Sequence, residues 1–281
     1  MKSKIQITIW TLISLLLLNI SSTYAQKSIE LKYNLNAGDK YMFVTDIEQD
    51  ITFEAMGNTT TLEQLMSFQM TSLVNKIEVD EIFMEFIFDR IKMNQKIFGM
   101  ELNYDSDDSS TFTSGMGAKI GEEFNKIIGA SVKVVMDDNG NIKDMDLSSI
   151  TDNSDLTNNL SSGNTYAVYP EGKVKVGESW ATDIKPLENS EMKVHMNYTL
   201  LKIARNHATI GVDGTLTANE VAGKEISLNG TTSGEMIVDR KTGILISSSI
   251  DMEIDMEMEE GGNKIPATIM STAVTTVKKV E

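Results

Sequence analysis

The chain of 281 residues contains no cysteine. This absence excludes disulfides, thiol chemistry and cysteine-ligated metal sites. It also excludes a bacterial lipoprotein, because the acylated first residue of such a protein must be cysteine. A secreted domain of about 256 residues without disulfides must rely on a hydrophobic core, and this length is sufficient to bury one.

Histidine is nearly absent as well, with only His195 and His207 in the chain. A hydrolase needs a base and a nucleophile within reach of each other. Neither histidine is flanked by a recognisable nucleophile motif, and the sequence contains no G-x-S-x-G. We therefore expect no Ser/His catalysis, no enzyme activity and no cofactor.

Basic residues are few, 25 against 41 acidic residues, and the formal net charge is −16. Phosphate contacts need clustered lysine and arginine, so this surface repels nucleic acid and anionic membranes. The acidity favours solubility, and no nucleic-acid partner is expected.

Long apolar runs are missing apart from one at the N-terminus. Lys2 and Lys4 precede an apolar stretch over Ile5–Ile20, and small residues lead to Ala25. This is the pattern of a signal peptide over residues 1–25, cleaved after Ala25. The alternative is a membrane anchor, but the apolar core is shorter than the about 20 residues of a span. We expect export to the periplasm or the extracellular medium, without stable membrane insertion after cleavage.

The most informative stretch that is present lies near the C-terminus. From Ile244 to Met258 every second residue is apolar except Ser248, and the intervening positions from Asp251 to Glu259 are all carboxylates. Because successive side chains of a strand point to opposite faces, this pattern predicts one long strand with an apolar face and an acidic face. About 15 residues at roughly 3.4 Å each give a length near 50 Å, which implies a large curved sheet.

Most other segments alternate in the same way. Lys40–Met56 mirrors the C-terminal strand, and Ser114–Ile128 is the one convincing amphipathic helix. Short connections predict antiparallel neighbours, with roughly ten or eleven strands in all. The predicted fold class is mainly β: a long curved antiparallel sheet or incomplete β-barrel, with one amphipathic helix packed on its concave face.

Residues 26–281 are expected to form a single β-rich domain. A turn with Gly38-Asp39 before Tyr41 is echoed by Gly177-Glu178 before Trp180. Two diverged halves, 26–168 and 169–281, would explain this echo. Reuse of the same turn chemistry in a β-meander would explain it equally well.

Three patterns resemble metal or glycosidase sites, and none is sufficient. Asp137–Asn141 resembles the start of a calcium loop but lacks the glycine and the glutamate that such a loop needs. Met192 and Met196 could suggest copper, but His195 would point to the opposite face of the strand. The carboxylate ladder of Asp251–Glu259 fits a solvated face better than a glycosidase, and no metal site is expected.

Methionine is the abundant residue, with 18 in the chain. Methionine fills irregular cores, and it is also frequent on surfaces that accept variable apolar partners. We therefore expect either a plain packed core in a structural or adhesive envelope protein, or a concave face that binds a hydrophobic small molecule or lipid. The candidate ligand-binding residues are Phe43, Ile47, Ile51, Met66, Phe68, Met70, Phe124, Met252, Ile254, Met256 and Met258.

A signal peptide, a GD-x-Y start at Gly38, the mid-chain VKVGESW at Val174–Trp180 and the late DRKTG at Asp239–Gly243 together resemble an uncharacterised family of secreted β-rich proteins from Bacteroidota. This resemblance implies no activity. The architecture is also similar to the incomplete β-barrel of periplasmic lipoprotein carriers, whose long strands curl around an apolar cavity.

Overall fold

A computed structural model describes residues 27–55, 58–112, 115–150, 167–184, 192–221, 224–260 and 263–281. The expected signal peptide and its cleavage site lie outside these residues. The elements are β1 (Ser28–Glu30), β2 (Lys40–Ala55), β3 (Asn58–Glu78), β4 (Glu81–Ile97), β5 (Met100–Asp105), η1 (Ser109–Phe112), α2 (Gly115–Asn125), β6 (Ser131–Met136), β7 (Ile142–Asp146), β8 (Lys173–Lys175), β9 (Ser179–Ile184), β10 (Lys193–Ile203), β11 (His207–Val221), β12 (Lys224–Asp239), β13 (Leu245–Glu260) and β14 (Asn263–Val280).

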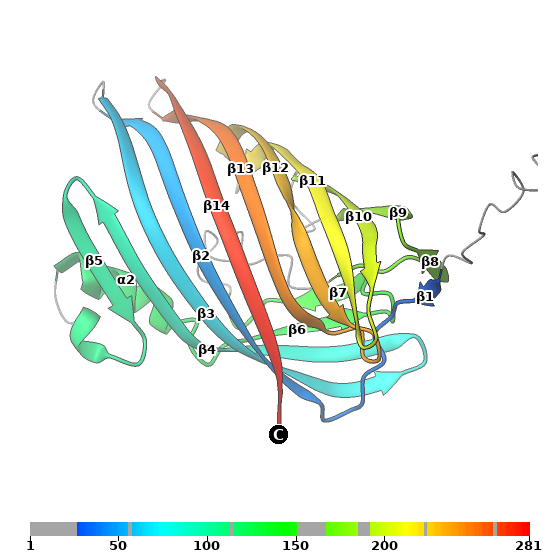
Figure 1. The fold of residues 1–281 in the computed structure, drawn as a ribbon. Helices are drawn as coiled ribbons and strands as arrows, with labels where there is room; N and C mark the ends of the chain where they lie inside the picture. Colours follow the sequence, from blue (N-terminus) through cyan, green and yellow to red (C-terminus); the bar gives the residue numbers. More distant parts are fainter. Residues whose placement is uncertain are drawn as a thin grey trace, which may run out of the picture.

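One open antiparallel sheet of 12 strands dominates the molecule, as the sequence predicts (Figure 1). Its order is β7-β6-β4-β3-β2-β14-β13-β12-β11-β10-β9. The twelfth strand, β5, pairs with the second half of β4, whereas β6 pairs with the first half. The last strand, β14, therefore joins β2 to β13 at the centre. The expected ten or eleven strands are too few: the main sheet alone has 12, and β1 and β8, with three residues each, pair in a separate small sheet.

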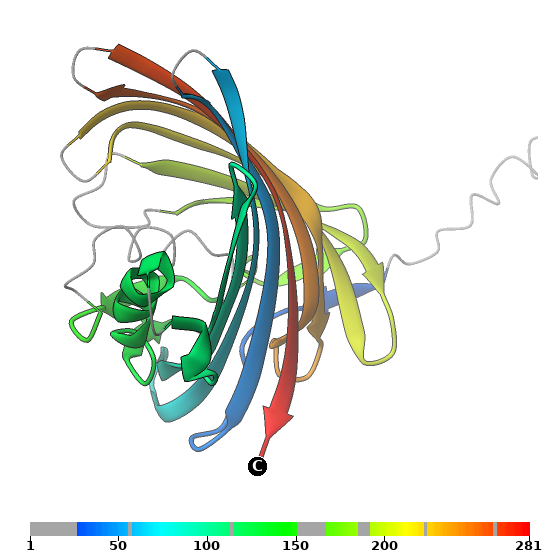
Figure 2. The same ribbon diagram turned by 90° about the vertical axis from the view of Figure 1, so that its left-hand side faces the viewer.

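The two faces of the sheet differ in chemistry, as alternation predicts. On β2 one face carries Phe43, Ile47 and Ile51, and the other carries Asp46 and Glu48. We call these the inner and the outer face. The inner face lies in the hollow of the curved sheet (Figure 2). The hairpins β2–β3, β11–β12 and β13–β14 turn at the tip end of the sheet, and the C-terminus of β14 marks the opposite, base end.

Inner-facing glycines and bulges accompany the strong curvature. A Cβ on Gly214 of β11 would lie 2.5 Å from the Met196 sulfur, and one on Gly230 of β12 would lie 3.0 Å from Ile254 Cγ1. Side chains of the neighbouring strands therefore occupy the space above these two glycines, where any larger residue would place its own Cβ. Register shifts occur in β10–β11 at Leu200/Lys202 and in β12–β13 at Ile237/Val238.

The second of these bulges corrects the expected alternation of the C-terminal strand. Ile237 pairs with Ser247 and Val238 with Leu245, so Ile246 is the extra residue. An extra residue reverses the faces of the strand that it interrupts. Accordingly Leu245 is buried whereas Ile246 is 39% exposed, and the apolar alternation on one face begins only beyond the bulge.

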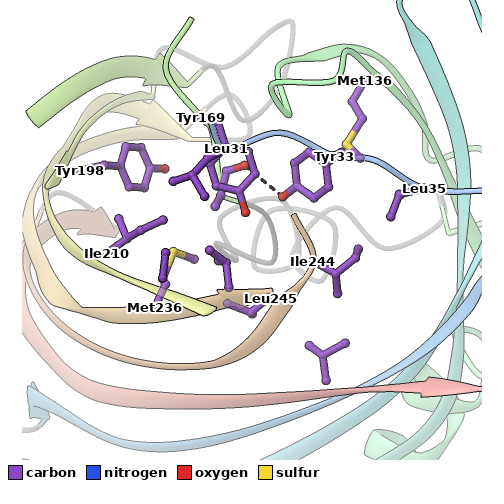
Figure 3. Packing of buried hydrophobic residues seen from close by; sticks show 14 of the residues in the cluster. Leu31, Tyr33, Leu35, Met136, Tyr169, Tyr198, Ile210, Met236, Ile244 and Leu245 are labelled. Carbon is purple, nitrogen blue, oxygen red and sulfur yellow. Dashed lines mark hydrogen bonds between the residues drawn. The ribbon is translucent and has the colours of Figure 1, made fainter. Parts of the chain in front are cut away.

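The base end of the hollow is filled by two segments that cross it. Leu31, Tyr33 and Leu35 come from the stretch after β1, and Ala167 and Tyr169 from the stretch before β8. They pack with inner-facing residues of β10–β13 such as Tyr198, Ile210, Met236 and Leu245 in one buried cluster, the base core (Figure 3). This second layer closes the base of the sheet.

The predicted helix is present on the concave side, as α2 (Figure 2). It ends at Asn125 rather than at the expected Ile128. The chain then turns, with Ala130 N donating to Ile127 O at 2.8 Å and Gly129 at a φ of 78°. No helix among the described residues is long and apolar enough to cross a membrane.

The turn motif that occurs twice in the sequence makes the same pair of backbone hydrogen bonds in both copies. Gly38 N donates to Val74 O and Val74 N to Asp39 O, while Gly177 N donates to Leu200 O and Leu200 N to Glu178 O, all at 2.8–3.0 Å. A bulge follows Val74 in β3 and Leu200 in β10. Common origin of the two halves stays a hypothesis, as does the single-domain assignment.

Candidate ligand-binding site

Inner-facing side chains on neighbouring strands lie in rows across the sheet. Ile47 of β2 pairs with Met66 of β3, Met66 with Met93 of β4, and Met93 with Tyr104 of β5. Nearer the tip end, Ile51 pairs with Ile269 of β14 and Ile269 with Ile254 of β13. The long strands thus carry an apolar surface from the base core towards the tips.

Part of this surface is covered by α2 and the turn that follows it. Phe124 is 8% exposed, and its ring centre lies 5.1 Å from that of Tyr104. Phe124 and Ile127 pack with inner residues of β3, β4 and β5 in the helix cluster, whose sheet members are Phe88, Ile91, Met93 and Tyr104, with Met66, Phe68 and Met70 at its edge. The helix cluster is therefore a two-layered core.

A third cluster has no hydrophobic member from a second layer among the described residues. It consists of Ala218, Leu228 and Ile254, which are buried, and of Leu216, Met252, Met256, Ile269 and Met192 packed against them. All members except Met192 belong to β11–β14. We call it the sheet platform. It differs from the base core and the helix cluster because its members come from one layer.

A row of uncharged polar side chains crosses the inner face of β4, β3, β2 and β14 and meets the platform at Met252. Gln95, Gln64, Gln49 and Ser271 pair in sequence across β4, β3, β2 and β14, and Ser271 pairs with Met252. The Gln49 amide donates to Gln64 Oε1, and the Gln64 amide donates to Met93 Sδ at 3.1 Å. We call this the glutamine row.

The inner face carries no formal charge along its central strands. In the described chain, no Asp, Glu, Lys or Arg occupies an inner position of β2 between Tyr41 and Phe53, or of β13 between Leu245 and Met256. The same holds for β14 between Ile265 and Val277. A charged group brought onto this face would be desolvated without an ionic partner, at a large cost in free energy.

The predicted site residues fall into three neighbourhoods rather than one. Phe43 is fully buried in the base core, where its ring packs on Phe86. Phe124, with Met66 and Phe68, belongs to the helix cluster, and Met70 contacts both clusters.

The other predicted residues lie nearer the tips. Met252, Ile254 and Met256 form the centre of the sheet platform, and Ile47 and Ile51 are half-buried on β2. Met258 pairs through its backbone with Ile226 and Ile265, and its side chain lies outside the described part. Platform residues that the pattern did not single out are Leu216 and Leu228, whose strands β11 and β12 are interrupted by glycines that weaken the alternation signal.

The outer face is hollowed in two places, which the sequence did not predict. One depression of about 550 Å³ crosses β14, β2, β3, β4 and β5, and a second of about 360 Å³ crosses β12, β13, β14 and β2. Both include Glu48 and Thr272 in their linings. The signal in the sequence was weak: single apolar residues, Leu65 and Met270, interrupt the polar outer face.

His195 and Asp137, which the sequence patterns linked to copper and calcium, make local polar contacts. His195 Nδ1 lies 2.7 Å from the Asp183 carboxylate on the exposed faces of β10 and β9. Within the described ranges, no group of three or more His, Cys, Asp or Glu is arranged to hold a metal ion. Asp137 instead caps its own turn, accepting hydrogen bonds from the backbone of Asn139 and Asn141 at 3.0 and 2.8 Å.

Residues 147–245 match the model of a family of unknown function (DUF6263). The match spans the segment from the end of β7 to the start of β13. It confirms the expectation of a domain to which no activity is attached. The secreted character, the bacterial group and the likeness to lipoprotein carriers stay predictions. A comparison with curated proteins finds no matching relative.

Solved structures of similar architecture include lipovitellin, in a study of its lipid–protein interactions, with a TM-score of 0.49 and 11% identity. The match covers 88% of this chain but only 26% of the lipovitellin chain. The translocator domain of the autotransporter NalP from Neisseria meningitidis matches with a TM-score of 0.24 and 6% identity, over 86% of this chain and 90% of that one. At these values neither resemblance transfers a function to this chain.

Proposed function

We propose that the protein binds a hydrophobic, lipid-like molecule on the sheet platform. The observation that carries this proposal is the single layer. The base core and the helix cluster each have a second layer of side chains, whereas the platform is built by β11–β14 and Met192. Leu216, Met252, Met256 and Ile269 remain only half-buried there. An apolar sheet face is stable in water when something covers it.

The chemistry of the face narrows the class of ligand. The long inner face of β2, β13 and β14 offers methionine, isoleucine and alanine. Its polar groups, in the glutamine row and at Thr45, Ser248 and Thr275, are neutral amides and hydroxyls. Such a surface suits an acyl chain or a similar hydrocarbon whose buried part is uncharged. From the row of Met252 to that of Met258 the strand advances by roughly 20 Å, enough for a long chain.

Export and a non-catalytic role belong to the same proposal. An exported carrier or receptor of lipid-like molecules needs an apolar surface for its ligand and an exterior that keeps it soluble. The net charge of −16 favours solubility. Among the described residues, His195 and His207 lie outside the linings of the two outer depressions, and we propose binding rather than catalysis.

The test is a fluorescence titration with the neutral dye N-phenyl-1-naphthylamine, using two matched variants. Met252→Gln places an amide on the platform, and Met270→Gln makes the same exchange on the outer face of the neighbouring strand β14. We expect dye binding by the wild type and a loss of affinity of at least about fivefold, or roughly 1 kcal/mol, in Met252→Gln. Met270→Gln should stay within about twofold of the wild type.

Absence of dye binding by the folded wild type, or equal weakening in both variants, would contradict the proposal. The protein would then be a structural β-protein of the envelope whose platform is covered by its own chain. Circular dichroism of each variant establishes that the fold is retained before affinities are compared.

A further inference from the structure

The two depressions on the outer face adjoin one another. The first runs between the row Asp46–Ser67–Lys92–Asp105 and the row Glu48–Leu65–Asn94–Asn103, as the strand registers show. The second runs over the neighbouring rows of β2, β14, β13 and β12. Because Glu48 and Thr272 line both, we treat them together as the outer groove.

The outer groove exposes apolar side chains where a solvated sheet face would carry polar ones. Leu65 is 52% exposed, Val274 41% and Met270 59%. Val274, Thr272 and Met270 follow one another along the outer face of β14, and Leu65 lies across Glu48 from Thr272. Apolar side chains gathered around a depression are typical of a surface that contacts another molecule.

The rim of the same groove is negative. It carries the carboxylates of Asp46, Glu48, Asp50, Asp251 and Glu253. The one basic side chain among the lining residues, Lys92, lies 3.8 Å from the Asp105 carboxylate, which Arg90 also binds at 2.7 Å. In the described part of the chain no lysine or arginine forms an ion pair with the five rim carboxylates. The groove therefore combines exposed apolar side chains with rim carboxylates that have no ion-pair partner in the described chain.

We propose that the outer groove binds an extended, positively charged peptide segment of a partner protein, in which lysine or arginine and apolar side chains share one face by occupying every second position. The apolar side chains would contact Leu65, Val274 and Met270, and the basic ones would face the rim carboxylates. Charge complementarity of this kind sets the specificity and the association rate of an interface. A metal ion fits the exposed apolar side chains poorly. This site is separate from the sheet platform and does not depend on it.

The probe is the peptide KTLTKTLTK with blocked termini, which carries lysine and leucine on one face when extended, titrated calorimetrically at physiological ionic strength, with ETLTETLTE as the acidic counterpart. We expect one site per chain for the basic peptide, weaker binding at high salt, and no binding of the acidic peptide.

Matched variants distinguish binding in the groove from attraction of the peptide by net negative charge alone. The pair Asp251→Asn with Glu253→Gln removes two charges inside the groove, and Asp255→Asn with Glu257→Gln removes two from the same face of the same strand outside it. The first pair should weaken the basic peptide at least about tenfold, and the second by less than about twofold. Met270→Gln should also weaken it several-fold, whereas Met256→Gln, on the platform and outside the lining of both depressions, should not.

Equal effects of the two charge pairs would overturn the proposal, because the peptide would then respond to net charge alone. Binding of the acidic peptide, or no binding by the wild type, would overturn it as well. Dye binding to the platform should be unchanged in the groove variants, so a failure here is distinguishable from a failure of the ligand-binding proposal.

Discussion

Three buried tyrosines hold the base core together. Tyr33 donates its hydroxyl to Ala167 O at 3.0 Å and its backbone N–H to Asp138 O at 2.7 Å. Tyr169 donates its hydroxyl to Gly243 O and its N–H to Asn139 O at 2.7 Å. Burial raises the pKa of all three phenols, and that of Tyr198 rises to about 12. Each of these side chains must therefore stay neutral for the crossing segments to remain packed.

The raised pKa of Tyr198 predicts a loss of stability in alkali. Its contribution is fully present below the unfolded pKa of about 10 and is lost as pH rises through the folded pKa of about 12. Between pH 8 and pH 11.5 ionisation of this one group should cost about 2 kcal/mol. Urea unfolding of Tyr198→Phe at both values should show a smaller loss than the wild type by that amount. An identical loss in both proteins would mean that Tyr198 ionises as readily in the folded state as in the unfolded one.

At the scale of elements, the sequence predicted the long strands with a regular alternation, but it missed the bulges in them and the shortest strands. Alternation over more than a dozen residues located β2 and β13 within about two residues of their ends, as expected for long periodic segments. The bulge at Ile246 could not be foreseen, because one extra residue is visible only against its partner strand. The strands β1 and β8 are too short to carry a period. Their pairing joins Ser28–Glu30 to Lys173–Lys175, a contact between distant segments.

The helix α2 gives the element-scale prediction. Phe124 is 8% exposed and packs on Tyr104, so Phe124→Ala removes a buried ring and should cost about 3–5 kcal/mol of unfolding free energy. The matched control is Phe98→Ala, since Phe98 is 66% exposed in the turn between β4 and β5 and should change stability by less than about 0.5 kcal/mol. Chemical denaturation measures both. A small effect at Phe124 would show that α2 contributes little to the sheet.

At the scale of the molecule, the sequence predicted a curved sheet with unlike faces but not how the inner face is divided. Phe43, Phe68 and Met256 share one alternation pattern, yet they lie in the base core, the helix cluster and the sheet platform. The division follows from Leu31, Tyr33 and Tyr169, which cross the base from outside the sheet. Their placement depends on contacts between segments more than a hundred residues apart, which no local period encodes.

The most direct measurement of the central claim is native mass spectrometry of the protein extracted mildly from the cells or medium that produce it. A platform that binds a lipid-like molecule predicts a mature chain carrying a co-purified adduct of a few hundred daltons. Met252→Gln should reduce that adduct and Met270→Gln should leave it unchanged. A bare mature chain, in a preparation that also fails to bind the neutral dye, would contradict the account and leave a β-sheet whose inner face serves packing alone.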